Sequence, residues 1–198
     1  MTNVNTARVV SLLAVIFSAT GAGAQTPGEP SSNVGLAVGM SVHRLQDNFG
    51  VSGSVSSPTF FNEKARMTAD GGVAWYPYGT GASGDQEWLP FGQSRVVVES
   101  GHRVGRAPLR LYGFGGAMLI FRSERLSDDL LAVAGIGGFG FEFFMPTNTM
   151  NAPASYFIEI GGVGSGARAT KIPGRPILLN GFVVEAGVRF YPCRGSVC

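Results

Sequence analysis

The sequence predicts an all-β protein, an eight-stranded antiparallel up-and-down transmembrane β-barrel. Alternation is the first reason: in residues 182–191 the apolar side chains at even positions share one face, while Glu185 and Arg189 lie on the other. The second is an apolar N-terminal segment with no long apolar run after it, which indicates an exported protein without a transmembrane helix. The third is low charge, since charged residues make up 14% of the chain against about 25% in a typical soluble domain.

The N-terminal segment has the features of a cleavable secretory signal peptide. Arg8 is followed by an apolar run over residues 9–17, and small residues end the segment at Ala24. The apolar run is about nine residues long, whereas a helix needs about 20 to cross a bilayer. We therefore expect a signal peptide at residues 1–24, a barrel at residues 25–192 and a short periplasmic tail at residues 193–198.

Composition leaves two classes of exported protein open. Gly supplies 30 of 198 residues, roughly double its usual share, and the two lysines are Lys64 and Lys171. A surface with so little charge suits lipid, and the alternative is a Gly-rich soluble sandwich. The net charge of +2 and the lack of a basic run argue against nucleic acid as a partner.

The first two strands are expected at residues 34–43 and 50–58. In the first segment, apolar residues at even positions from Val34 to Val42 alternate with glycine, alanine and serine. In the second segment, valines alternate with serines. Both patterns are typical of a strand with two different faces.

The third strand is expected at residues 64–76, where Arg66 and Asp70 lie opposite the apolar side chains. It ends at Trp75 and Tyr76. We expect this pair at a membrane interface, because aromatic rings with a polar edge prefer that position.

The fourth strand is expected at residues 88–100, where Arg95 and Glu99 oppose valines. The Gly-rich residues 78–85 before it predict a flexible loop, and residues 101–107 after it predict a turn.

The fifth and sixth strands are expected at residues 108–121 and 130–145. Arg110 and aromatic residues oppose leucines in the fifth, and Glu142 and glycines oppose phenylalanines in the sixth. A charged loop at residues 122–129 connects them.

The seventh strand is expected at residues 155–168, where Glu159 opposes tyrosine and isoleucine. A β-bulge at residues 161–162 can shift the inward–outward alternation of this strand by one residue. Residues 182–191 form the eighth strand. An even number of strands of about ten residues, with both termini on one side, matches the smallest membrane barrels.

Several stretches resemble the OmpA/OmpX-like outer-membrane β-barrel domain superfamily. They are residues 57–62 (SPTFFN), 110–113 (RLYG), 138–144 (GFGFEFF), 157–161 (FIEIG) and 187–191 (GVRFY). The resemblance implies eight antiparallel strands, termini in the periplasm, four outward loops and a place in the bacterial outer membrane. Members often end on an aromatic residue that serves as an assembly signal, whereas this chain continues past Tyr191. Recognition by the barrel-insertion machinery is expected through Gly187, Phe190 and Tyr191.

A barrel brings the polar strand faces together in its lumen. The charged residues expected there are Arg66, Asp70, Arg95, Glu99, Arg110, Glu142, Glu159, Glu185 and Arg189. An eight-stranded interior is filled by side chains or holds one small ligand, so we expect these groups to pair rather than line an open pore. Arginine suits such pairs because its guanidinium binds carboxylates with two hydrogen bonds. The alternative is a gated ion path.

The sequence predicts no enzyme, cofactor or metal site. Small barrels include lipid-modifying enzymes that use a serine with a histidine base. His102 is expected in a periplasmic turn, and His43 at the outer end of the first strand, where Ser41 shares its face. We interpret His43 as a rim residue without chemistry. Scattered carboxylates form no metal-ligand pattern.

Cys193 and Cys198 follow the last strand. In an oxidising periplasm they are expected to form a small disulfide loop of minor stabilising effect. A tether to a partner or an unpaired thiol are the alternatives.

The four outward connections are expected at residues 43–49, 77–87, 122–129 and 169–180, and they are short for an adhesin. We therefore predict a monomeric barrel with a structural or general surface role, in contact with outer-membrane lipid. The first alternative is a narrow channel for small solutes or ions, and the second is a lipid-modifying enzyme.

Overall fold

A computed structural model describes residues 35–61, 64–79, 86–105, 107–145, 154–166, 170–171 and 180–192. All of them belong to one compact unit. The expected signal peptide at residues 1–24 and the tail with Cys193 and Cys198 lie outside the described residues. Within the described part of the chain there is no helix long and apolar enough to cross a membrane.

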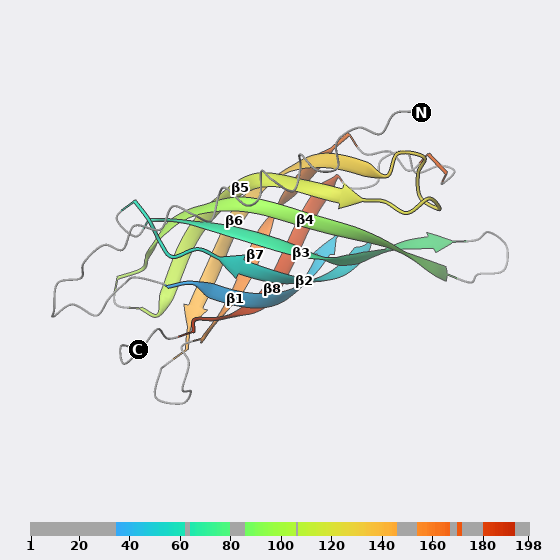
Figure 1. Cartoon of the computed structure of the whole chain (residues 1–198). Helices are drawn as coiled ribbons and strands as arrows, with labels where there is room; N and C mark the ends of the chain where they lie inside the picture. Colours follow the sequence, from blue (N-terminus) through green and yellow to red (C-terminus); the bar gives the residue numbers. More distant parts are fainter. Residues whose placement is uncertain are drawn as a thin grey trace. The chain divides into compact units, whose positions relative to one another are not determined.

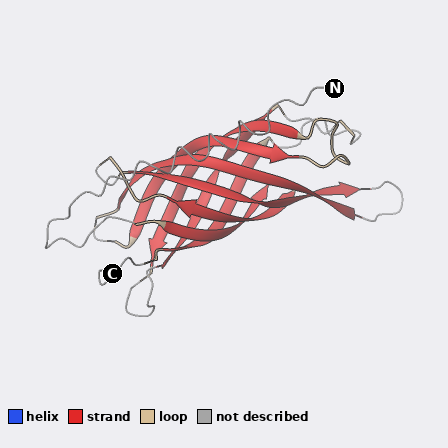
Figure 2. Cartoon of the chain, viewed as in Figure 1, coloured by secondary structure: helices blue, strands red, loops and turns tan. Residues whose placement is uncertain are grey.

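Eight antiparallel strands form a closed barrel in which each strand pairs with its neighbours in sequence (Figure 1). Strand is the only regular secondary structure in the described residues (Figure 2). The strands are β1 (Ala37–Leu45), β2 (Asn48–Ser56), β3 (Ala65–Gly79), β4 (Gln86–Arg103), β5 (Leu109–Phe121), β6 (Leu131–Phe144), β7 (Ala154–Ser165) and β8 (Gly181–Phe190). The predicted fold class is confirmed, and each predicted segment overlaps one strand.

Pairing of the first strand with the last closes the barrel. Val38 lies opposite Phe190 at one end of this pairing, and Leu45 lies opposite Val183 at the other. Along the length that all eight strands share, closure leaves no unpaired edge, so the backbone donors and acceptors there are satisfied without water. We call the end where β1 begins and β8 ends the terminal end, and the opposite end the loop end.

Three local expectations are corrected. Strand β4 extends to Arg103, so His102 lies in a strand rather than a turn. Strand β3 continues through Pro77 to Gly79, because each of its last residues pairs with β4. No bulge interrupts β7: residues 161–162 pair in unbroken register with both neighbouring strands.

The hairpin of β3 and β4 projects beyond the other strands at the loop end (Figure 1). Residues 86–91 of β4 pair with β3, whereas pairing of β4 with β5 begins at Gly92. Trp88 is exposed on this hairpin, while Leu89 is buried over the barrel interior.

The outward face of the barrel wall is apolar. Alternation places a valine, leucine, isoleucine, methionine, aromatic residue or glycine at most outward positions. Among these positions in the described strands, the one formally charged side chain is Arg44, beside the loop end. Exposed apolar side chains include Leu36, Val38, Met40, Val42, Val51, Val55, Val73, Val98, Leu131, Val133, Phe139, Ile158 and Phe182.

Aromatic side chains gather near both ends of this apolar wall. Near the loop end Phe49 stacks on Trp75, with ring centroids 6.3 Å apart. Near the terminal end Phe143 stacks on Tyr156, with centroids 4.8 Å apart. Strand β5 runs over 13 residues from Leu109, which pairs with Phe143, to Phe121. This corresponds to about 40 Å along the strand and about 30 Å along the barrel axis at the usual tilt. Tyr76, expected beside Trp75 at an interface, instead faces inward and is buried, because neighbouring side chains alternate.

The interior has two differently filled halves. The terminal half and the middle hold charged and hydroxyl side chains, whereas the loop-end half is filled mainly by an apolar cluster that we call the apolar plug. The buried polar side chains at that end include His43, Asn48, Gln93 and Arg122. The plug consists of Leu45, Ala74, Tyr76, Leu89, Phe91, Met118, Ile120, Leu126, Ala134, Ile136, Val163 and Val183. Leu126 comes from the β5–β6 connection and is completely buried, so this connection folds into the barrel mouth. The expectation that polar strand faces fill the lumen therefore holds for part of its length.

Two adjacent glycines on β5 test the packing of the wall. A Cβ on Gly116, which faces inward, would overlap the carbonyl oxygen of Val96 and lie 2.8 Å from the Cα of Val97. A Cβ on Gly115, which faces outward, would have its nearest atom, the oxygen of Ile136, at 4.0 Å. We predict that Gly116→Ala lowers the free energy of unfolding by about 1–3 kcal/mol, because the strands must move apart.

The control Gly115→Ala should change that free energy by less than about 0.5 kcal/mol. Denaturant titration in detergent, followed by tryptophan fluorescence, measures both variants. Equal midpoints for the two would contradict the close approach of β4 and β5.

Candidate functional site

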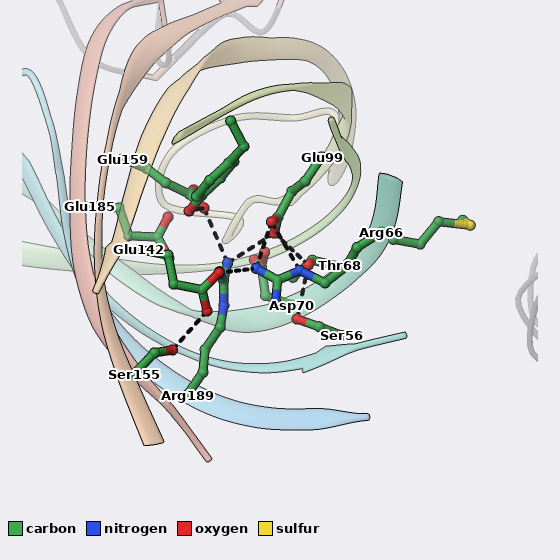
Figure 3. Close-up of polar contacts among 12 residues, drawn as sticks. Ser56, Arg66, Thr68, Asp70, Glu99, Glu142, Ser155, Glu159, Glu185 and Arg189 are labelled. Carbon is green, nitrogen blue, oxygen red and sulfur yellow. Dashed lines mark hydrogen bonds and ion pairs between the residues drawn. The ribbon is translucent and has the colours of Figure 1, made fainter. Parts of the chain in front are cut away.

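Nine charged side chains meet inside the barrel. They are Arg66 and Asp70 on β3, Arg95 and Glu99 on β4, Arg110 on β5, Glu142 on β6, Glu159 on β7, and Glu185 and Arg189 on β8. Each has at most 6% of its surface exposed. The structure thus places every lumen residue expected from the sequence in one connected set of ion pairs, which we call the lumen network. Figure 3 labels its members other than Arg95 and Arg110.

Glu99 is the centre of the part nearest the terminal end. Its carboxylate accepts hydrogen bonds from Arg66 Nη2 at 2.7 Å, Arg189 Nη2 at 2.9 Å and Arg110 Nη1 at 3.0 Å. The three guanidinium groups come from β3, β8 and β5, so one carboxylate ties together strands from different sides of the barrel. Figure 3 shows Arg66 and Arg189 beside Glu99. Thr68 Oγ1 also donates to Glu99, at 2.7 Å.

Glu142 is the second acceptor in this part. Arg66 Nη2 donates to its Oε2 at 2.8 Å, and Ser155 Oγ donates to its Oε1 at 2.7 Å. The hydroxyl of Tyr191 also donates to Glu142. Because these donors come from β3, β7 and the residue after β8, Glu142 joins the end of the chain to the network.

Arg95 is the centre of the part in the middle of the barrel. It forms ion pairs with Asp70, with Glu185 at 2.7 Å and with Glu159 at 3.2 Å. Arg189 connects the two parts, because its Nη2 also lies 3.3 Å from Glu159 Oε1.

Strand register explains several of these contacts. Arg66 pairs across the sheet with Glu99, Asp70 with Arg95, and Arg110 with Glu142. Opposite charges at such positions are stabilising. Glu159 and Glu185 are also direct cross-strand partners, and like charges there repel each other. Arg95, from the opposite wall, offsets this repulsion by binding both carboxylates.

Formal charge is unevenly distributed in the network. Near the terminal end, three arginines (Arg66, Arg110, Arg189) surround two glutamates (Glu99, Glu142), which gives 3 − 2 = +1. In the middle, Arg95 faces three carboxylates, which gives 1 − 3 = −2. Buried charges need partners, so the two parts depend on each other through Arg189.

Aromatic rings cover the guanidinium faces that carboxylates leave free. The Cζ of Arg189 lies 4.1 Å from the ring centroid of Phe157, and the Cζ of Arg110 lies 4.9 Å from that of Tyr112. Such contacts are favourable, and stronger where water is excluded. Tyr112 also donates its hydroxyl to Glu159 at 2.8 Å. Alternation put Tyr112 on the face of Arg110, but no role in the network was predicted for Tyr112 or Phe157.

His43 is a lumen residue, which corrects the expectation of a rim histidine. Its side chain is buried, and the Nε2 atoms of Gln93 and His43 are 2.8 Å apart, with the Gln93 amide donating. Ser41 shares the inward face of His43, as expected, and its hydroxyl hydrogen-bonds that of Ser52 at 2.8 Å. The reason is strand length: β1 continues to Leu45, so His43 lies below the mouth.

The apolar plug was missed, although the sequence carries a signal for it. Towards the loop end, β4 reads Trp88, Leu89, Pro90, Phe91, and β5 reads Met118, Leu119, Ile120, Phe121. Both faces of each strand are apolar there, which indicates that both faces are buried or lipid-facing. Nothing in the alternation pattern indicated that Leu126, in the connection between strands, joins the plug.

Two further ion pairs join the segments that connect strands at the loop end. Arg125 pairs with Glu87 on the projecting hairpin at 2.6 Å, and Lys171 pairs with Asp128 at 3.0 Å. Lys171 lowers the pKa of the Asp128 carboxyl by hydrogen bonding and charge attraction. These contacts are exposed, and pairs of this kind contribute little to stability.

Within the described part of the chain, no group of three or more histidine, cysteine, aspartate or glutamate side chains is arranged to hold a metal ion.

No protein-family model matches the chain, and no curated protein matches it. Among solved structures, the chain is similar to the crystal structure of the N-terminal β-barrel domain of Pseudomonas aeruginosa OprF. The sequence identity is 11%, the TM-score is 0.49, and the alignment covers 78% of this chain and 95% of that chain. Similarity at this level carries no conclusion about function. The strand pairing itself establishes the eight-stranded barrel, the fold that the resemblance to OmpA/OmpX-like domains implies.

Two isosteric substitutions compare how much each part of the network contributes to the free energy of unfolding. Glu99→Gln leaves three buried guanidinium groups without their shared carboxylate, and removing one member of a buried ion pair typically costs about 3–5 kcal/mol. We predict a loss of that size in the free energy of unfolding.

The matched change Glu185→Gln should cost less than about 1 kcal/mol, because Arg95 keeps Asp70 and Glu159 while one like-charge contact disappears. Chemical unfolding in detergent measures both. A larger loss for Glu185→Gln than for Glu99→Gln would contradict the charge distribution described above.

Proposed function

We propose that this protein is an integral β-barrel of the bacterial outer membrane with a structural or general surface role and a closed lumen. The observation that carries the proposal is inverted polarity: nine charged side chains are buried inside, while the outward wall is apolar. In water, that wall would expose a large hydrophobic area, which soluble monomers rarely do. In lipid, the same wall is favourable.

Barrel closure and the aromatic residues support the same environment. A closed barrel satisfies its backbone hydrogen bonds internally, which is required in the hydrocarbon core of a bilayer. The aromatic side chains near both ends of the wall resemble the girdles with which membrane barrels meet the two interfaces. On this basis the terminal end faces the periplasm and the loop end faces outward.

The filling of the interior supports a closed lumen over the alternative of a narrow channel. Ions would have to break the pairs around Glu99 and Arg95 and then cross the apolar plug. Hydrophobic constrictions exclude water and block conduction. Side chains from seven strands and Leu126 of the β5–β6 connection form the plug.

The second alternative, a lipid-modifying enzyme, needs a serine and a histidine base in contact with lipid. His43 is buried beside Gln93, and Ser41 is bonded to Ser52, so these two do not form such a pair. We therefore retain the structural role. Proposed partners are outer-membrane lipid and, during assembly, the barrel-insertion machinery acting on Gly187, Phe190 and Tyr191, with a monomer as the final state. Export through the signal at residues 1–24 and a disulfide between Cys193 and Cys198 remain predictions.

Gel mobility in SDS tests membrane insertion and barrel closure together. Closed barrels stay folded in detergent at room temperature, so the membrane-extracted protein should migrate differently before and after boiling. Unchanged mobility, with the protein recovered in the soluble fraction, would support a soluble sandwich instead.

Planar-bilayer recording then tests the closed lumen. We predict no reproducible single-channel steps from the refolded protein, because the apolar plug closes the loop-end half. Gly115→Ala, which alters only the outward face, serves as the control for insertion. Regular conductance steps from the unmodified protein would favour the narrow channel.

A further inference from the structure

The charges buried in the lumen network do not balance. Its four arginines face five carboxylates, which gives a formal charge of 4 − 5 = −1. The excess lies in the middle of the barrel, where three carboxylates share the guanidinium of Arg95. They are Asp70, Glu159 and Glu185. A buried charge without a counter-charge is costly, and an ionisable group in that position becomes neutral by binding or releasing a proton.

Glu159 and Glu185 lie side by side in this part of the network. They are direct cross-strand partners on β7 and β8, and both project into the lumen (Figure 3). Their Oε2 atoms contact one nitrogen, Arg95 Nη2, at 3.2 Å and 2.7 Å respectively. Of two carboxyl groups that share a site in this way, one keeps its proton to a higher pH than an isolated carboxyl does.

The hydrogen bonds of Glu159 indicate which oxygen carries the proton. Its Oε1 accepts hydrogen bonds from the Tyr112 hydroxyl at 2.8 Å and from Arg189 Nη2 at 3.3 Å. Its Oε2 has no hydrogen-bond partner among the described residues, although only 2% of the residue is exposed. A buried carboxylate oxygen normally has a donor, so an atom without one fits the O–H oxygen of a neutral carboxyl group.

His43 does not supply the missing positive charge. It lies opposite Glu185 in the register of β1 and β8, and its Nε2 accepts a hydrogen bond from the Gln93 amide. A ring nitrogen that accepts a hydrogen bond carries no proton, so the imidazole is neutral. Charged and titratable side chains face the Glu159–Glu185 pair from every side, and they are His43 on β1, Asp70 on β3, Arg95 and Glu99 on β4, Tyr112 on β5 and Arg189 on β8.

We propose that the Glu159–Glu185 pair is a proton-binding site that holds one proton at neutral pH, carried on Oε2 of Glu159. With this proton the lumen network is electrically neutral. Folding then takes up one proton from solvent, because an exposed glutamate in the unfolded chain is ionised at this pH. The barrel is therefore more stable in a mildly acidic envelope than in an alkaline one. The site is enclosed by the barrel itself, so the proposal does not depend on the membrane location.

Infrared spectroscopy of the refolded protein in detergent at pH 7 tests the proton directly. A protonated carboxyl group has a carbonyl stretch that ionised carboxylates lack, and we expect one such band. Glu159→Gln should remove the band, whereas the matched control Glu87→Gln, which changes an exposed carboxylate at the loop end, should leave it unchanged. Carbon-13 labelling of glutamate carboxyl groups should shift the band. No band, a band that survives in Glu159→Gln, or an unshifted band that belongs to Asp70 would overturn the proposal.

The pH dependence of chemical unfolding gives an independent readout. Between pH 7 and 8 unfolded histidines are neutral, so the charging of His43 on unfolding, which has the opposite sign, does not contribute. We expect the folding equilibrium constant of the unmodified protein to fall about three- to tenfold over this unit of pH. Glu159→Gln should lose this dependence, and Glu87→Gln should keep it.

Two further variants complete the test. If Glu159→Gln does not fold, Glu185→Gln replaces it, because removing the neighbouring charge allows Glu159 to ionise with the loss of both the band and the pH dependence. His43→Gln should keep the pH dependence. Its loss in His43→Gln, or equal pH dependence in Glu159→Gln and the unmodified protein, would overturn the assignment of the proton to the glutamate pair.

Discussion

The carboxylate of Glu99, with three guanidinium groups around it, is the interaction on which the rest of the structure depends. Arg66, Arg110 and Arg189 reach it from three strands, so the wall is held together across the lumen as well as along its backbone hydrogen bonds. In the interior of a protein such pairs are strong only when each charge is fully partnered. The network therefore fixes which strand faces can turn inward, and with them the polarity of the outer wall.

Inverted polarity follows from closure. In a soluble sandwich the apolar faces would meet each other and the charged faces would meet water, whereas in this barrel the charged faces meet each other. The wall then presents valine, leucine and phenylalanine to its surroundings over most of its height. Glycines at outward positions of β5 and β6 leave this surface uneven, with a shallow depression at Gly113.

The interior is divided along its axis into two different environments. The lumen network occupies the terminal half and the middle, and the apolar plug occupies the loop-end half. Ion pairs gain strength where water is excluded, so the plug also protects the network from one side. Opening the interior along its whole length would require simultaneous loss of apolar packing and of paired charges, which is the basis of the closed lumen that we propose.

The sequence by itself determined the strands, their inward and outward faces, and the identity of the charged lumen residues. Alternation of period two is a local property, so Arg95 and Glu99 could be assigned to one face without knowledge of their partners. Only the tertiary structure decided the pairing. Strand register placed Glu159 opposite Glu185 and so made Arg95 their common partner. It also buried His43 beside Gln93 and brought Leu126 into the barrel mouth, because these contacts join residues far apart in the chain, and no local pattern specifies them.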